Sequence, residues 1–244
     1  MRAITASELL EIWEYGAGQA SNQRALQLLE AAFPTTSREA LAALSVGERD
    51  ARMLMLREQL WGPEMVGFAV CPGCRERLEL PLNAAEMLAA AGQAAPRELS
   101  LSVDGYTTTF RLPTSQDMIA ASRSADFDDA RLVILERCLI SARLGGEPIH
   151  ANCLPEEVVA EIAQCMEEAD PLANIQIRLS CPCCDHRWRA AFDIASFLWK
   201  EIEVWARRAV SDVHTLATAY GWSEREVLSL SPVRRQMYLE MVGT

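Results

Sequence analysis

Apolar residues recur at steps of three and four along the first quarter of the chain. This helical spacing covers residues 6–33, with a glycine-containing break inside it, and returns from Ser45 to Gly62. A proline directly after Gly62 ends the second stretch, because proline cannot continue a helix. The pattern predicts an N-terminal helical region over residues 1–65.

The same spacing returns in the last fifty residues. An apolar stripe from Asp193 to about Tyr220 predicts the longest helix of the chain. Ser223 and Glu226 stand three residues apart, as in a capping box, and predict a shorter helix after it. We therefore expect a C-terminal helical region over residues 194–244.

The middle of the chain, residues 66–193, contains stretches that alternate apolar and polar residues, as strands do. Two of them, residues 98–103 and 106–112, flank Asp104-Gly105, a pair typical of a tight hairpin turn. The sequence therefore predicts a β-hairpin in the central region.

After this hairpin a helix is predicted to begin at Thr114 or Ser115, and two further helices follow it. The first extends from Asp126 to Arg143 and is ended by Gly145-Gly146. The second extends from Pro155 to about Glu168. The acidic residues at its end, including Asp170, are expected to form a solvated face.

The two stretches that organise the central region are Cys71-Pro72-Gly73-Cys74 and Cys181-Pro182-Cys183-Cys184. The second repeats the first 110 residues later, and the flanking apolar positions repeat with it. Each copy reads as strand, Cys turn, strand. Residues 66–83 and 174–193 are therefore predicted to be the two halves of a zinc ribbon.

Two Cys-x-x-Cys turns supply the four sulfurs of a closed tetrahedral zinc site. The predicted ligands of one structural Zn²⁺ per chain are Cys71, Cys74, Cys181 and Cys184. Cys183 and His186 are alternatives to Cys184, and thiol redox chemistry is the alternative to metal binding. Four thiolates leave no position for a water molecule, so the metal is expected to support folding rather than catalysis.

These elements predict an α+β protein that is mainly helical. Its helices are expected to pack around a small β module, and the module contains a two-knuckle zinc ribbon and a β-hairpin. The eight cysteines favour reduced thiols and metal over a disulfide framework, since no export signal is seen.

The net charge of −11 changes the expected partners. A chain this acidic is repelled by phosphate backbones, which speaks against nucleic acid. The N-terminus lacks the apolar run of a signal peptide, and no stretch approaches the roughly 18 apolar residues of a membrane span. We expect a cytoplasmic protein with no membrane partner.

No group of residues suggests catalysis. His150 and His214 are isolated from any nucleophile or carboxylate motif, and no glycine-rich phosphate loop is present. The chain is therefore expected not to be an enzyme. Trp199, Trp205 and Trp222 are candidates for a partner surface, although core packing is expected for at least half of the six tryptophans.

One basic feature keeps a nucleic-acid role open. Arginines stand at equivalent positions beside the two Cys turns: Arg75, Arg77, Arg187 and Arg189. They could form a basic face on the ribbon. A zinc-ribbon regulator that binds nucleic acid is therefore an alternative function.

Four stretches together cover most of the chain and carry a resemblance. They are the pair of Cys turns; Ser45–Arg52 with Leu60–Pro63; Phe110–Thr114 with Leu135–Cys138; and Tyr220–Glu224 with Leu228–Ser231 and Arg234–Leu239. With these stretches the chain resembles the T-even-type phage baseplate hub assembly chaperone family, which has relatives in contractile injection system clusters. Compact phage members need not carry the ribbon, so the two Cys hairpins depart from the simplest family pattern.

The resemblance implies a non-enzymatic chaperone or adaptor that helps a baseplate hub or spike assemble. The implied partners are baseplate, hub or spike proteins of a phage tail-like particle, and the family supplies no catalytic residues. A permanent structural subunit of the baseplate is the alternative in the same setting. The resemblance names neither a client nor an oligomeric state.

Overall fold

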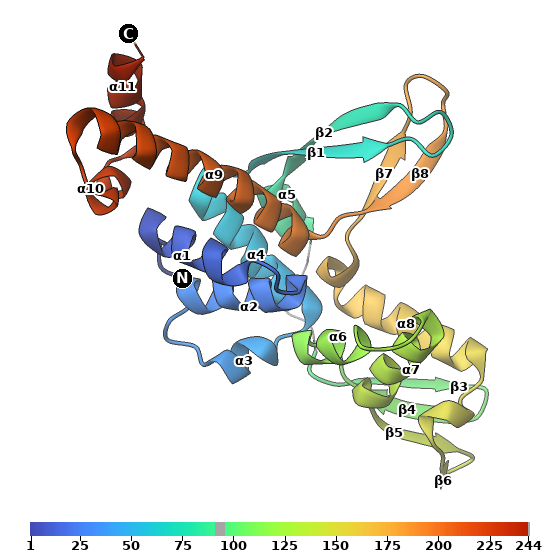
Figure 1. The fold of residues 1–244 in the computed structure, drawn as a ribbon. Coiled ribbons are helices and arrows are strands. Elements are labelled where there is room, and N and C mark those ends of the chain that lie inside the picture. The colour runs from blue at the N-terminus through green and yellow to red at the C-terminus, as the bar shows by residue number, and fades with distance from the viewer. Residues whose placement is uncertain (91–95, 244) are drawn as a thin grey trace. The chain divides into compact units, whose positions relative to one another are not determined.

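A computed structural model describes residues 1–90 and 96–243 of the chain, which divides into two compact units. Unit 1 combines Met1–Pro34 with Ala195–Thr244, and unit 2 is Thr35–Ile194. Helices dominate, and the described strands form small antiparallel sheets (Figure 1), which confirms the predicted mainly helical α+β class. The three regions predicted from the sequence do not coincide with these two units, and that division into regions stays a prediction.

The described part of unit 1 is helical. Its helices are α1 (Ala6–Gly16), α2 (Ser21–Ala32), α9 (Ile194–Tyr220, whose first residue belongs to unit 2), α10 (Glu224–Ser229) and α11 (Pro232–Val242). Leu10 of α1, Ala206 and Ala209 of α9 and Leu228 of α10 form a buried apolar cluster. The predicted long helix and the capping box of Ser223 and Glu226 are both confirmed.

Trp199 on α9 is a core residue of unit 1 rather than part of a partner surface. Its side chain is buried, and its ring lies so close to Gly16 that a β-carbon there would come within 2.2 Å of it. The guanidinium of Arg24 lies 4.5 Å from the ring centroid and makes a cation–π contact. Trp205 packs against the apolar cluster of unit 1. For these two tryptophans the expectation of core packing is confirmed.

Unit 2 contains the remaining helices and the strands. The helices are α3 (Arg38–Ala42), α4 (Val46–Trp61), α5 (Ala84–Ala90), α6 (Ser115–Ala121), α7 (Phe127–Cys138) and α8 (Glu156–Ala169), with 3₁₀ turns η1 (Ala151–Cys153) and η2 (Pro171–Asn174). Within residues 1–90 and 96–243, no helix is both long and apolar enough to cross a membrane.

The described residues of unit 2 form three antiparallel sheets. Two are hairpins, β1 (Glu64–Val70) with β2 (Arg77–Asn83), and β7 (Gln176–Ser180) with β8 (Arg187–Ala191). The third has the order β3 (Leu99–Val103), β4 (Tyr106–Phe110), β5 (Leu139–Leu144) and β6 (Glu147–Pro148). The two predicted Cys hairpins and the hairpin around Asp104-Gly105 are confirmed.

The helix predicted from Asp126 to Arg143 is wrong in its last third. Helix α7 ends at Cys138, and the next six residues form β5 beside β4. The backbone N–H of Arg111 donates to the carbonyl of Cys138 at 2.9 Å, so pairing with β4 begins where the helix ends. Gly145-Gly146 is the turn between β5 and β6, with positive φ at both residues, rather than a helix end.

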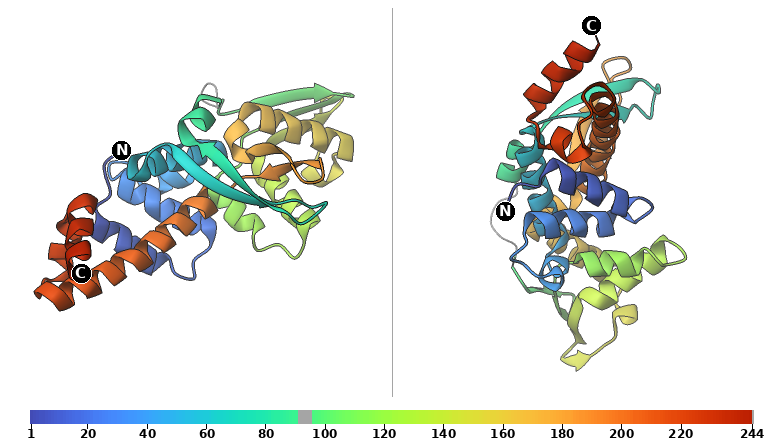
Figure 2. Two further views of the ribbon diagram at one scale, coloured as in Figure 1. Left: turned by 90° about the horizontal axis from the view of Figure 1, so that it is seen from above. Right: turned by 60° about the vertical axis from the view of Figure 1, so that its left-hand side comes forward.

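The four-stranded sheet has an apolar core of its own. Side chains from β4, β5, α7, α8 and the segment before α8 form it: Phe110, Leu135, Ala142, Leu154, Val158 and Ile162. Strand β3 lies beside helix α8 (Figure 2). Burial of apolar side chains therefore stabilises this part of unit 2.

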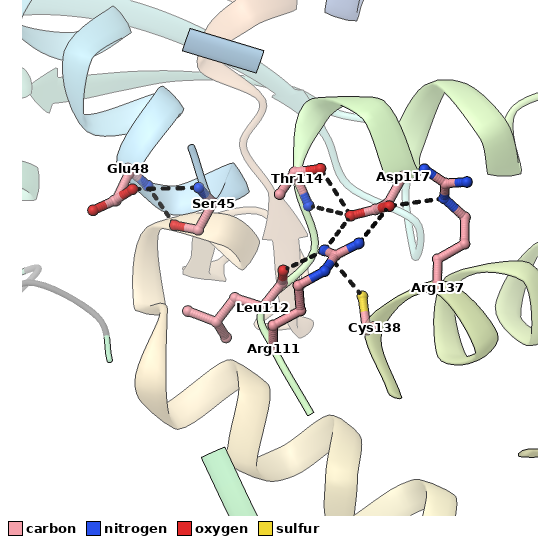
Figure 3. A network of polar contacts seen from close by, with 8 residues as sticks. All are labelled: Ser45, Glu48, Arg111, Leu112, Thr114, Asp117, Arg137 and Cys138. Carbon is pink, nitrogen blue, oxygen red and sulfur yellow. Dashed lines mark hydrogen bonds and ion pairs between the residues drawn. The ribbon is translucent and has the colours of Figure 1, made fainter. Parts of the chain in front are cut away.

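Asp117 joins the end of β4 to helices α6 and α7 (Figure 3). The Arg111 guanidinium donates to both oxygens of its carboxylate, at 2.6 and 3.0 Å, and Arg137 Nε donates at 2.8 Å. The backbone N–H and the hydroxyl of Thr114 also donate to it, at 2.9 and 2.8 Å. Burial of the side chain raises the pKa of Asp117, but these donors outweigh it and hold that pKa well below its usual range.

Asp170 was predicted to lie on a solvated face, and this prediction is wrong. The side chain is buried at the start of α4. Its carboxylate accepts a hydrogen bond from the backbone N–H of Gly47 at 2.9 Å. A β-carbon on Gly47 would lie 1.9 Å from the Asp170 carboxylate, so only glycine fits there. The carboxylate satisfies an N–H that the helix itself leaves unpaired, and its charge suits the helix N-terminus.

Candidate metal centre

Both Cys turns have the same main-chain geometry. In the first, the N–H of Cys71 donates to the carbonyl of Glu76, and the N–H of Arg75 donates to the carbonyl of Cys71, both at 2.9 Å. The residues 110 positions later make the same two bonds at the same distance. Arg75 and its counterpart Asp185 both adopt a left-handed conformation, with φ of 66° and 55°. The sequence repeat is therefore a structural repeat.

The two turns bring four sulfur atoms together. Cys71 Sγ lies 3.7 Å from Cys184 Sγ, Cys74 Sγ lies 3.5 Å from Cys181 Sγ, and all four atoms lie within 4.8 Å of one another. These separations are too long for disulfides, which need about 2.05 Å. A tetrahedral ion with metal–sulfur bonds of about 2.3 Å would place its ligands about 3.8 Å apart. The cluster therefore has the size needed to hold one metal ion.

The four-sulfur cluster contains Cys184, and neither of the two alternative ligands belongs to it. Cys183 is exposed. His186 lies against the opposite turn, where a β-carbon on Gly73 would be 3.3 Å from the His186 β-carbon. The His186 ring also stacks on Trp188, with centroids 5.9 Å apart. Gly73 therefore lets the two turns approach closely.

The protonation of the cluster favours a bound cation. Desolvation opposes ionisation of Cys181, but hydrogen bonds from the backbone N–H groups of Cys183 and Cys184 and from neighbouring thiols lower its pKa to about 7. At Cys74, a backbone hydrogen bond with Glu76 acts in the same direction, but the sulfurs around it raise its pKa to about 12. One thiolate therefore forms readily and a second is opposed, unless a metal ion neutralises their repulsion.

Both hairpins approach each other at their Cys turns (Figures 1 and 2), with Cys71 and Cys181 fully buried and Cys74 and Cys184 exposed. The sequence matches the family described as T4 bacteriophage base plate protein over residues 6–199. The chain belongs to this family. Comparisons with curated proteins and with solved structures found no match.

In this base plate family member the match covers both Cys turns and ends within α9. His150 and His214 are both exposed, and neither belongs to the four-cysteine group that could hold a metal ion among the described residues. The family match supports a non-enzymatic role in a baseplate.

The strand register reveals one basic residue that sequence analysis did not single out. Arg178 on β7 lies directly opposite Arg189 on β8. On the first hairpin, Arg77 lies 5.8 Å from the ring centroid of Phe68 and makes a cation–π contact. Arg178 could have been found from the alternation of residues 176–180, which places it on the face of the strand opposite its apolar neighbours.

Proposed function

We propose that this protein is a non-enzymatic chaperone or adaptor for assembly of the baseplate hub in a phage tail or contractile injection system. The family match over residues 6–199 carries the proposal. Its partners would be baseplate, hub or spike proteins. We place its action in the cytoplasm, because free cysteines kept reduced there remain available to a metal.

An exposed apolar stripe on α11 supports a protein-binding role. Val233, Met237 and Met241 stand four residues apart and share one helix face, with exposed fractions of 73%, 53% and 59%. Contiguous exposed apolar side chains mark interaction sites, and methionine adapts to partner surfaces of different shape. The stripe lies beyond residue 199, outside the family match. We propose it as a contact for a baseplate protein.

We propose that Cys71, Cys74, Cys181 and Cys184 bind one structural Zn²⁺. Four thiolates at these separations suit zinc, and the closed set gives the metal no open position for a reactive water. The ion would cross-link residue 71 to residue 184 and so close one loop of chain between them. Its contribution would be to the folding of unit 2.

Particle composition tests the chaperone assignment. Deletion of the gene should prevent hub assembly, and mass spectrometry of finished particles from the wild type should not detect the protein. Detection at one or more copies per hub would contradict a chaperone that leaves the particle. Normal particles from the deletion strain would overturn any role in assembly.

A permanent baseplate subunit is the second candidate, and the family's own description as a base plate protein favours it. The same mass spectrometry distinguishes the two candidates. A resident subunit should be found in finished particles in a fixed ratio to the other hub proteins.

A further inference from the structure

The outer side of the second Cys hairpin carries three arginines, which we call the basic face: Arg178, Arg187 and Arg189. Arg178 and Arg189 are direct cross-strand partners, and Arg187 is two residues from Arg189 on the same side of β8. All three are exposed, whereas the alternate residues Leu179 and Trp188 are half-buried. The three guanidinium groups therefore share one side of the hairpin.

This arrangement has an electrostatic cost within the isolated chain. Like charges directly opposite each other on a sheet are destabilising. The chain has 34 acidic residues against 23 basic ones, yet no ion pair or hydrogen bond of these three side chains occurs among the described residues. A bound anionic group would remove the repulsion.

The basic face also borders a pocket with apolar walls. Its volume is about 400 Å³, and it is lined by the three arginines together with Leu179, Ser180 and Trp188. Arginine side chains hold carboxylates through paired N–H donors. Leu179 and Trp188 alternate with the arginines along the strands and lie on the other side of the hairpin, so the guanidinium groups are what an acidic segment would contact.

The ribbon fold does not itself require this charge. The residues of the first hairpin equivalent to Arg178 and Arg189, 110 positions earlier, are Phe68 and Glu79. The outer side of β1 instead exposes Val66, Phe68 and Val70, with exposed fractions of 50%, 65% and 54%. The equivalent of Arg187 is Arg77, so the first hairpin presents three apolar side chains and one of these arginines, whereas the second presents all three arginines.

We propose that the basic face binds an acidic segment of a partner protein. The proposal rests on the proposed function and names the chemistry of the partner surface. A protein segment fits better than nucleic acid because the chain as a whole is strongly acidic, and three arginines would release few counterions from a phosphate backbone. The exposed apolar side chains of β1 also suit a protein partner.

Fluorescence anisotropy with two labelled probes tests the proposal on the full chain, purified in the presence of zinc. One probe is a glutamate-rich peptide that also contains leucines, and the other is single-stranded DNA of equal charge. The test variant combines Arg178→Gln, Arg187→Gln and Arg189→Gln. We expect wild type to prefer the peptide, the test variant to bind it at least about tenfold more weakly, and added salt to weaken the wild-type complex.

A matched control variant combines Arg123→Gln, Arg208→Gln and Arg225→Gln, which lowers the net charge equally at exposed positions outside the second Cys hairpin. It should bind the peptide as wild type does. Equal binding by the test variant would overturn the proposal, and so would tighter binding of DNA than of peptide. Unchanged metal content and circular dichroism show that the test variant folds, and Arg189→Gln alone replaces it if it does not.

Co-expression with the other baseplate proteins separates this proposal from the proposed function. Recovery of wild type in a baseplate complex, with at least about tenfold less of the test variant, supports both. Equal recovery of the two would leave the assembly role intact and overturn the basic face as a docking site. If wild type enters no complex, the proposed function fails, whatever the peptide binding shows.

Discussion

The ribbon and the four-stranded sheet both belong to unit 2, but different forces hold them. Phe110 and Ala142 of the sheet form a buried apolar core with four side chains from α7, α8 and the segment before α8. In the four ribbon strands, all of them described, Met65 is the one large apolar side chain that is buried. The fully buried residues at the ribbon tips are Cys71 and Cys181.

We infer from this difference that the ribbon is stabilised mainly through its cysteine sulfurs, and the four-stranded sheet through burial of apolar side chains. A two-stranded hairpin is at best marginally stable in water unless it packs against something or is cross-linked. The ribbon hairpins lie far apart in sequence, so bringing their tips together has a loop-closure cost that few apolar contacts offset. We therefore expect the ribbon to unfold when the metal is removed, and the sheet to unfold when a side chain of its core is truncated.

The largest effect is expected from Cys71→Ser. In small zinc domains about 10–16 kcal/mol of metal-binding free energy is coupled to folding. The variant should lose tight metal binding, and hydrogen exchange should become fast in residues 64–83 and 176–191 while β3–β5 stay protected. Cys153→Ser is the matched control, because Cys153 is exposed and outside the cluster. Protected ribbon amides in metal-free Cys71→Ser would contradict the account.

The reverse experiment is Phe110→Ala, which empties the centre of the sheet core. Phe110 is completely buried, so we expect a loss of about 3–5 kcal/mol in the free energy of unfolding of this part. Metal content should stay unchanged, since none of the four cysteines contacts this core cluster. Loss of metal together with the sheet would show that the two regions fold as one.

A smaller effect is expected from Asp117→Asn, which removes the charge shared by Arg111 and Arg137. Because both arginines are partly exposed, we expect a loss of about 3 kcal/mol, at the low end for a broken buried ion pair. The pKa of Asp117 is depressed in the folded state, so its contribution is complete above the unfolded pKa of about 3.9 and is lost as pH falls through the folded value.

Urea unfolding of wild type and Asp117→Asn checks this pH dependence. The difference between the two proteins should be largest near neutral pH and shrink below about pH 4. A difference that grows with acidity would mean that the carboxylate is not the source of the stability.

The smallest effect is expected from Gly73→Ala, which tests how tightly the two turns fit. The added β-carbon would lie 3.3 Å from the His186 β-carbon and 3.5 Å from Cys184 Sγ, so the turns must separate slightly. We expect a cost of about 1 kcal/mol, seen as weaker zinc binding in a chelator competition. Cys183→Ala is the control, because Cys183 is the equivalent residue of the second turn and is exposed.

The sequence predicted best those features that depend on local chemistry. The Cys-x-x-Cys repeat, the Asp104-Gly105 turn and the capping residue Ser223 each specify a local backbone conformation, and each is present as expected. The sulfur cluster also agrees with the sequence because ligand spacing on a tight turn constrains it.

The errors arise where distant residues decide the local structure. Residues 139–144 continue the apolar spacing of α7, yet they pair with β4, and Arg111 binds the carbonyl at the helix end. Asp170 reads as the acidic end of a solvated helix until the fold places it against Gly47. The set of arginines predicted from the sequence also lacked Arg178, because its position opposite Arg189 depends on strand register.

The central claim is that two Cys turns, 110 residues apart, hold one zinc ion through four thiolates. X-ray absorption at the zinc edge, with metal quantified on the same sample of full chain, tests it most directly. The account predicts one zinc per chain with four sulfur ligands at about 2.3 Å. A disulfide-bonded chain without zinc, or a nitrogen ligand from His186 in place of Cys184, would contradict it.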